Sequence, residues 1–480
     1  MTIKALFKDT LIYGVSTILM RLLSWVLTPY YTNRLNGPVE LGIIGELYAY
    51  VAFFNIIYMF GMETAYFRFV KDHDEKDVYN TAQNIVFFVS GSLTILLLLL
   101  ATPIANAMHY EGKEIYIRLF AFILFFDNMV NISLAQLRQK GQSKKFVFLK
   151  TIYILFNVIL NIIFVEFIIR GNFENIHKED QVLWIVLANF VPSFLLFLYF
   201  SKSIISSIKK YNKILLDKML PYSYPLLIVG LAGMVNETLD RTLLKYLLPG
   251  TVEENLYQIG IYSANYKLSI IMSLAIQAFR MGAEPFFFKN ADDSNAPKMY
   301  ATIMNYFTVA CCIIFVLTYL NLGWISKILS SKFNEGIIVV PILLLANMFL
   351  GMYYNTTIWY KITNQTSKGG IVAVFGAIIT IILNILLIPE MGYLGSAIAT
   401  LVCYFSMYVI SSLWGNFYFP IPYNYFFLFV MITSSIIISY FIRFIYQKEW
   451  YVTLFFSLLF PAIIFYYIYN QWKRNKNFIS

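Results

Sequence analysis

Residues 81–108 read TAQNIVFFVSGSLTILLLLLATPIANAM, a run without a single charged side chain. A bilayer core about 30 Å thick is crossed by a helix of roughly 20 residues. Hydrocarbon offers no hydrogen-bond partner to an exposed backbone, so an apolar run of this length crosses the membrane as a helix. Similar runs surround Trp25, Phe53 and Phe125 and recur to the end of the chain.

These runs predict about fourteen membrane helices of roughly 20 residues or more, joined by short charged loops. Hydrophobic residues make up 59% of the chain and charged residues 13%, whereas a soluble domain carries about 25% charged residues. We therefore predict an all-α polytopic membrane protein. The predicted helices span residues 9–33, 41–69, 81–108, 114–137, 146–169, 181–201, 217–247, 257–288, 299–321, 336–360, 369–388, 393–415, 424–443 and 451–472.

The formal net charge of +10 does not indicate a nucleic-acid partner, because the basic residues are spread over loops. Lysines and arginines concentrate in alternate loops, such as 138–145, 202–218 and 473–476. The positive-inside rule assigns these loops, and with them both termini, to the cytoplasm. The first apolar run is too long for a signal peptide and lacks a cleavage site, so we expect a membrane helix there.

An internal repeat is visible in two independent motifs. Gly61-x-Glu63-x-x-Tyr66-Phe67-Arg68 recurs 221 residues later as Gly282-x-Glu284-x-x-Phe287-Phe288-Lys289. Arg138, Gln142 and Asn161 recur as Lys361, Gln365 and Asn384, at an offset of 223.

The two similar offsets predict two six-helix lobes, residues 1–210 and 211–415. Residues 416–480 add two helices and a cytoplasmic tail. An even number of helices gives both lobes the same orientation, so they would be parallel repeats about a pseudo-two-fold axis along the membrane normal. A cavity between such lobes is the usual arrangement for alternating access.

Charged groups inside the predicted helices mark candidate functional residues. An ionisable side chain at mid-bilayer costs roughly 2.5–3.5 kcal/mol and therefore faces protein or water. Polar stripes at helical spacing lie on the first, second, seventh and eighth helices. The candidate cavity residues are Thr17, Arg21, Glu63, Glu237, Arg241, Ser273, Gln277, Arg280 and Glu284.

Several of these residues have a structural alternative. Arg280 with Glu284, and Glu237 with Arg241, are four residues apart and could form ion pairs along their own helices. Glu63 and Asp127 could equally be buried polar links between helices. Asp127, Glu237 and Asp240 are candidate carriers of a coupling proton or sodium ion.

The arginines indicate the charge of the ligand. Arg21, Arg241 and Arg280 would make the cavity partly cationic. Because arginine forms forked hydrogen bonds to phosphate oxygens, such a cavity favours an anionic ligand. The lipid-like part of that ligand would stay in the bilayer while its head crosses.

Signatures of other functions are missing from the sequence. There is no phosphate-binding glycine-rich loop and no room for a nucleotide-binding domain. The three histidines fall in predicted loops, and Cys311, Cys312 and Cys403 lie in apolar runs. We therefore predict no enzymatic activity, no metal site, no disulfide and no cofactor.

Four segments carry a resemblance to a known family: Tyr13-Gly14 to Pro29-Tyr30, residues 61–69, residues 240–244 and residues 277–287. The chain resembles the polysaccharide transporter, or O-antigen flippase, family. The superfamily of that family also contains the multidrug and toxin extruders and the peptidoglycan precursor flippase. The resemblance implies fourteen helices in two six-helix lobes.

The resemblance also implies a function and a location. The expected substrate is an undecaprenyl-diphosphate-linked oligosaccharide, moved to the periplasmic leaflet of the bacterial inner membrane for lipopolysaccharide or other surface polysaccharide. Relatives hold the pyrophosphate with cavity arginines, and Arg21 and Arg280 stand where such residues are expected. The expected partners are membrane lipid, this substrate and a coupling proton or sodium ion. We expect a monomer, with polysaccharide-assembly proteins as candidate contacts.

Two rival hypotheses remain open. A cation-coupled multidrug exporter of the same architecture would carry an acidic cavity, and Glu63, Asp127, Glu237, Asp240 and Glu284 rival the arginines in number. A polymerase, ligase or glycosyltransferase of lipid-linked glycans would need a sizeable external loop. The longest external loop is short, and residues 172–180 show no catalytic pairing.

Overall fold

The computed structural model describes residues 22, 25–170, 180–208, 210–363, 365–445, 451–452, 454–456 and 459. These residues form helices and connecting turns, without a strand among them. Eleven of their helices are long and apolar enough to cross a membrane, and α10 with α11 gives a twelfth span if the two are counted together. The prediction of an all-α multi-pass membrane protein is confirmed.

The described residues do not yield the predicted count of fourteen spans. Much of the first predicted helix, residues 9–33, and most of the last, residues 451–472, lie outside them. The other predicted spans each correspond to one helix or to a broken pair of helices.

The chain divides into two compact units. Unit 1 comprises residues 1–263 with 384–392, and unit 2 comprises residues 264–383 with 393–480. The predicted lobes, 1–210 and 211–415, stay a prediction, because a division by compactness does not test whether the sequence repeats.

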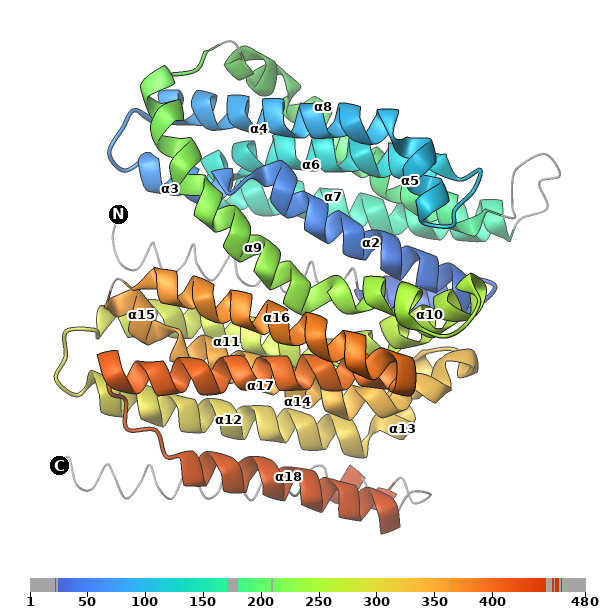
Figure 1. Ribbon diagram of the computed structural model, residues 1–480, viewed down its shortest axis with the longest axis vertical. Helices are drawn as coiled ribbons and strands as arrows, with labels where there is room; N and C mark the ends of the chain where they lie inside the picture. The colour runs from blue at the N-terminus through green and yellow to red at the C-terminus, as the bar shows by residue number, and fades with distance from the viewer. Residues whose placement is uncertain are drawn as a thin grey trace. The chain divides into compact units, whose positions relative to one another are not determined.

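Unit 1 is built from helices that pack lengthwise (Figure 1). In it α4, α6 and α8 pack on one another, α7 lies on α8, and α9 lies along α2. Its helices are α2 (Pro38–Met59), α3 (Met62–Phe69), α4 (Glu75–Leu99), α5 (Ala101–Ala107), α6 (Glu114–Gln139), α7 (Ser143–Ile163), the π-helix η1 (Phe164–Ile169), α8 (Gln181–Ile208), α9 (Lys213–Leu247) and most of α10 (Val252–Leu268).

The second predicted span is broken between α2 and α3 by the backbone at two residues. Phe60 and Gly61 have φ angles of 50° and 70°, in the left-handed region. Glycine adopts this conformation without a Cβ clash, so Gly61 ends one helix and allows the next to start in a new direction. The break places Glu63 in the first turn of α3.

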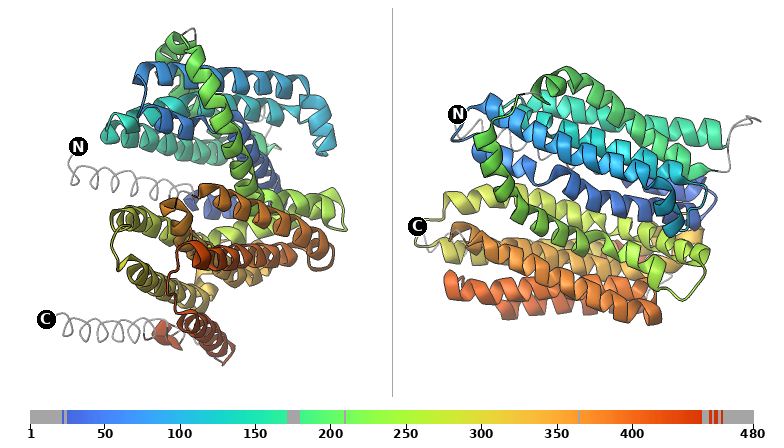
Figure 2. Two further views of the ribbon diagram at one scale, coloured as in Figure 1. Left: turned by 60° about the vertical axis from the view of Figure 1, so that its left-hand side comes forward. Right: turned by 45° about the horizontal axis from the view of Figure 1, so that its top comes forward.

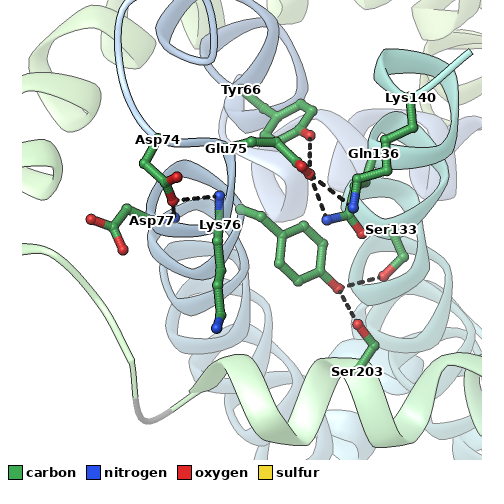
Figure 3. Close-up of polar contacts among 10 residues, drawn as sticks. Tyr66, Asp74, Glu75, Lys76, Asp77, Ser133, Gln136, Lys140 and Ser203 are labelled. Atoms are coloured by element: carbon green, nitrogen blue, oxygen red, sulfur yellow. Dashed lines mark hydrogen bonds and ion pairs between the residues drawn. The ribbon is translucent and has the colours of Figure 1, made fainter.

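Polar contacts fix α4 against its neighbours (Figure 3). Asp74 caps the helix by accepting hydrogen bonds from the backbone of Lys76 and Asp77. Glu75 Oε1 accepts from Gln136 Nε2 of α6 at 2.7 Å. One turn further along α4, the Tyr79 hydroxyl hydrogen-bonds Ser133 of α6 and Ser203 of α8.

Unit 2 is a second bundle, seen from two further directions in Figure 2. In it α14 packs on α17, and α12 packs on both α14 and α18. Its elements are α11 (Ile270–Lys289), α12 (Ala296–Leu320), α13 (Leu322–Ile325), η2 (Ser326–Ile328), η3 (Ser331–Ile338), α14 (Val339–Thr356), α15 (Ile358–Ile362), most of α16 (Thr366–Met391), α17 (Tyr393–Tyr418) and α18 (Tyr425–Ile445).

The outward faces of several spans are apolar, as hydrocarbon requires. On α7 the side chains of Phe148, Ile152 and Ile159 are 62%, 47% and 48% exposed. Exposed apolar side chains in such numbers would be a liability in water but are solvated by lipid tails. The charged side chains of the spans therefore need protein or water around them.

Candidate functional site

Arg280 of α11 lies against an aromatic ring of a neighbouring helix. Its guanidinium carbon is 3.9 Å from the ring centroid of Tyr354 on α14. This distance places the cation on the face of the ring, where the electrostatic attraction is strongest. Within the part of the chain that the structure describes, no carboxylate lies within ion-pair distance of this half-buried arginine. Its N–H donors are therefore available to an anion.

A pocket opens beside Arg280, within unit 2. It is a small depression that is open to solvent on one side. The polar or charged side chains in its wall are those of Arg280, Glu284, Tyr354, Asn355, Thr357 and Lys361. They come from α11, α14, the residue between α14 and α15, and α15.

Glu284 does not pair with Arg280, although the two are four residues apart on α11. Its carboxylate instead forms an ion pair with Lys361 of α15. The alternative of an Arg280–Glu284 ion pair is therefore wrong. Lys361 was not a predicted site residue, although its place in the sequence repeat was a signal that could have found it.

The equivalent residues of the first predicted lobe, residues 1–210 (the first half), form an ion pair of the same kind. Arg138 of α6 binds the carboxylate of Glu63 on α3, and the arginine also lies 5.0 Å from the ring centroid of Phe67. The offsets are those of the sequence repeat, 221 from Glu63 to Glu284 and 223 from Arg138 to Lys361. In each half, a basic residue near the end of the fourth predicted helix thus holds an acidic residue near the end of the second.

Arg280 has no basic counterpart in the first half. Subtracting 221 from 280 gives Met59, and subtracting 223 from 354 and 355 gives Asn131 and Ile132. The ion pair is thus common to both halves, whereas the cation that lacks a carboxylate partner belongs to the second half.

Two amide oxygens near Arg280 have no hydrogen-bond partner among the described residues. They are Oε1 of Gln277, three residues before Arg280, and Oδ1 of Asn355 in the pocket wall. Ser273, one turn further along α11, donates to Asn347 Oδ1 at 3.0 Å and so ties α11 to α14. The predicted cavity residues Ser273, Gln277 and Arg280 therefore follow one another along one face of α11.

The predicted alternative of an ion pair between Glu237 and Arg241 on α9 is not what the structure shows. Asp240 accepts a hydrogen bond from the Tyr262 hydroxyl at 2.6 Å and lies 3.6 Å from Arg241 Nη1. Arg241 reaches the backbone carbonyl of Glu237 rather than its carboxylate. Asp240 is 4% exposed, whereas Glu237 is exposed.

Asp127 of α6 has a cation near it that the site prediction missed. Lys150 of α7 lies close enough to act on its carboxylate electrostatically. The Tyr153 hydroxyl contacts the Ser193 hydroxyl of α8, at 3.2 Å. The sequence signal for the contact with Asp127 was Lys150 itself, a charged residue two turns inside an apolar helix.

A second missed feature is a buried ion pair in unit 1. Lys245 Nζ of α9 donates to Glu46 Oε2 of α2 and, at 2.6 Å, to the carbonyl oxygen of Met108. The Tyr110 hydroxyl, from the loop before α6, donates to the same carboxylate. Burial, together with the negative charge of Glu46, raises the pKa of Tyr110, so this phenol stays a donor.

The remaining predicted cavity residues, Thr17 and Arg21, lie outside the described residues. Their place relative to Arg280 stays a prediction. No group of three or more histidine, cysteine, aspartate or glutamate side chains that could hold a metal ion occurs in the described part of the chain.

Sequence comparison gives one matching family model and a distant relative. The model, described as polysaccharide biosynthesis protein, matches residues 6–291. A protein of Haemophilus influenzae named Lsg locus putative protein 1 is 22% identical over 290 residues. The match covers 59% of this chain and 66% of the relative, so the chain spans just under two thirds of that protein's length.

Solved structures share the fold at low sequence identity. The lipid II flippase MurJ in an inward closed conformation superposes with a TM-score of 0.68 at 14% identity, over 96% of this chain and 99% of that chain. An inward-facing multidrug resistance MATE family transporter of the MOP superfamily gives 0.61 at 13% identity, over 83% and 94%. An outward-facing transporter of that family gives 0.60 at 12%, over 86% and 95%.

Proposed function

We propose that this chain, which belongs to the polysaccharide biosynthesis protein family, moves a polyprenyl-diphosphate-linked oligosaccharide across the bacterial cytoplasmic membrane. It is a multi-pass membrane protein with the fold of the MOP-superfamily transporters and of the lipid II flippase. In the proposed orientation both termini are cytoplasmic, and the head group travels outward by alternating access of the lobes 1–210 and 211–415.

The observation that carries this proposal is the environment of Arg280. A guanidinium inside a membrane helix is costly unless an anion or water compensates it. Here its flat face is occupied by Tyr354, which leaves the edges that carry the N–H groups for a ligand. Phosphate oxygens match that fork, and a diphosphate offers several of them.

Other predicted residues complete the proposed site. We expect Arg21 to share the diphosphate with Arg280, while Thr17, Ser273 and Gln277 supply polar contacts to the head group. The unpartnered oxygen of Gln277 suits a hydroxyl donor such as that of a sugar. Asp127, Glu237 and Asp240 are the candidates for carrying a coupling proton or sodium ion.

One observation favours the second candidate function, a cation-coupled multidrug exporter. Glu237 presents an exposed carboxylate in the apolar span α9, and an organic cation would be attracted to such a group. The fold does not separate the two functions, because MATE transporters share it.

The deciding experiment uses a strain lacking the gene. Deletion is expected to leave lipid-linked oligosaccharide in the cytoplasmic leaflet, and the wild-type chain to restore its export. Arg280→Ala is expected to insert normally but to restore little export, while Met59→Ala, at the matching position of the first half, serves as the control. Normal lipid distribution after deletion, together with new sensitivity to cationic drugs, would favour the multidrug exporter.

A further inference from the structure

We propose that Lys361 is a positioning residue: by holding Glu284, it keeps Arg280 available for the anionic ligand. This inference rests on the proposed function, in which Arg280 binds the diphosphate of the lipid-linked substrate.

The competition arises from helix geometry. Arg280 and Glu284 are one turn apart on α11, at the spacing at which acidic and basic side chains attract each other. Both line the same pocket and are partly covered by protein, so the attraction between their charges is screened less than between fully exposed groups. A ligand anion that approaches Arg280 must therefore compete with the Glu284 carboxylate.

In the structure Glu284 is paired with Lys361 and not with Arg280. Lys361 Nζ binds the carboxylate of Glu284, and Arg280 lies on Tyr354 instead. The Lys361 and Glu284 side chains are 26% and 41% exposed. The pair is thus accessible enough to exchange partners, yet screened less than a surface pair.

The position of Lys361 is itself well fixed. Two residues before it, Trp359 is 1% exposed, and its indole N–H donates to the backbone carbonyl of Ser411 on α17 at 2.9 Å. This contact fixes α15 against α17 and so helps to hold the Lys361 ammonium group next to Glu284. Removing the ammonium would leave Glu284 uncompensated beside Arg280, where it would pair with the guanidinium or repel the incoming anion.

The equivalent ion pair in the first half of the chain provides a control for a purely structural role of Lys361. Arg138 and Glu63 form the matching ion pair, but Met59 stands at the position that matches Arg280. Breaking the first-half pair loosens a helix contact and releases a carboxylate that has methionine, not arginine, one turn before it in the sequence. Arg138→Met is therefore the matched control for Lys361→Met.

The test measures binding of undecaprenyl diphosphate without sugar to the purified full-length protein in nanodiscs. Lys361→Met is expected to weaken binding about tenfold, a size typical of coupling between neighbouring charged groups. Adding Glu284→Gln to Lys361→Met is expected to restore the affinity, because the released competitor is then neutral. Arg138→Met is expected to bind as the wild type does, and thermal unfolding of each variant reports its folding.

Three outcomes would overturn the inference. They are unchanged binding by Lys361→Met, weak binding that Glu284→Gln fails to restore, and equal weakening by Arg138→Met. In each of them the wild type still binds the probe and Arg280→Ala does not, so the proposed function survives. If Arg280→Ala binds the probe as well as the wild type, the proposed site is wrong and the inference falls with it.

Discussion

Lys245 Nζ lies 2.8 Å from Glu46 Oε2, and the two side chains are 1% and 0% exposed. The pair joins α9 to α2 in unit 1, close to a contact that depends on glycine. A Cβ on Gly42 would overlap the carbonyl of Leu256, and one on Gly260 the carbonyl of Pro38. An ion pair and a close backbone approach therefore fasten α2 to α9 and α10 at the same end of the bundle, which faces the periplasm in the proposed orientation.

Removing one partner of the buried pair is expected to be costly. Lys245→Met leaves the Glu46 carboxylate buried without its cation, a change that typically costs about 3–5 kcal/mol. The expected result is a markedly lower thermal unfolding temperature in detergent. Adding Glu46→Leu should recover part of that loss, since no buried charge then remains and only the Tyr110 hydroxyl and the Met108 carbonyl lose these partners. Equal unfolding temperatures for the wild type and Lys245→Met would show that water reaches the pair.

The glycine contact can be tested separately from the charges. Gly260→Ala should destabilise the protein, because its methyl group would meet backbone atoms of α2 that cannot move aside independently. Gly233→Ala is the control, since no atom of the described residues lies within 4 Å of the added Cβ and alanine favours a helix interior by about 1 kcal/mol over glycine. Opposite shifts in unfolding temperature are expected, and a loss from both substitutions would contradict the assignment.

The sequence predicted the spans well because a membrane helix depends on length and hydropathy, both of which can be read from one segment. It predicted less of what each polar side chain contacts. Helical spacing placed Arg280 and Glu284 on one face, but the partner of Glu284 comes from α15, 77 residues away. Lys361 belongs to the repeat motif, but its contact with Glu284 depends on how α15 packs, which one sequence does not show.

The buried pair was missed for a related reason. Lys245 is near the end of α9 and Glu46 is about two turns from the start of α2, positions from which a long charged side chain often reaches water. Only the packing of α2 against α9 shows that both are covered. The break at Phe60 and Gly61 was also missed, because two residues with left-handed backbone angles hardly change the hydropathy of a span.

The Tyr354 ring should strengthen the binding of an anionic ligand by Arg280. Its ring supports the guanidinium at 3.9 Å, and such contacts contribute about 0.5–2 kcal/mol. Tyr354→Leu is expected to weaken undecaprenyl diphosphate binding several-fold, whereas Tyr354→Phe, which keeps the ring, should stay near the wild-type affinity. If Tyr354→Phe loses as much as Tyr354→Leu, the hydroxyl group and not the ring is what matters.

The candidate coupling carboxylates differ in a way that transport measurements can resolve. Asp240 is buried and held by the Tyr262 hydroxyl and by Arg241, so Asp240→Asn should chiefly lower the unfolding temperature. Glu237 is exposed in its span, which makes it the better candidate for carrying the coupling ion. Glu237→Gln should therefore reduce the stimulation of transport by a proton or sodium gradient in proteoliposomes while leaving stability unchanged. Gradient-driven transport that survives Glu237→Gln but is abolished in folded Asp240→Asn would reverse these roles, because the buried carboxylate would then be the one that changes its charge during the cycle.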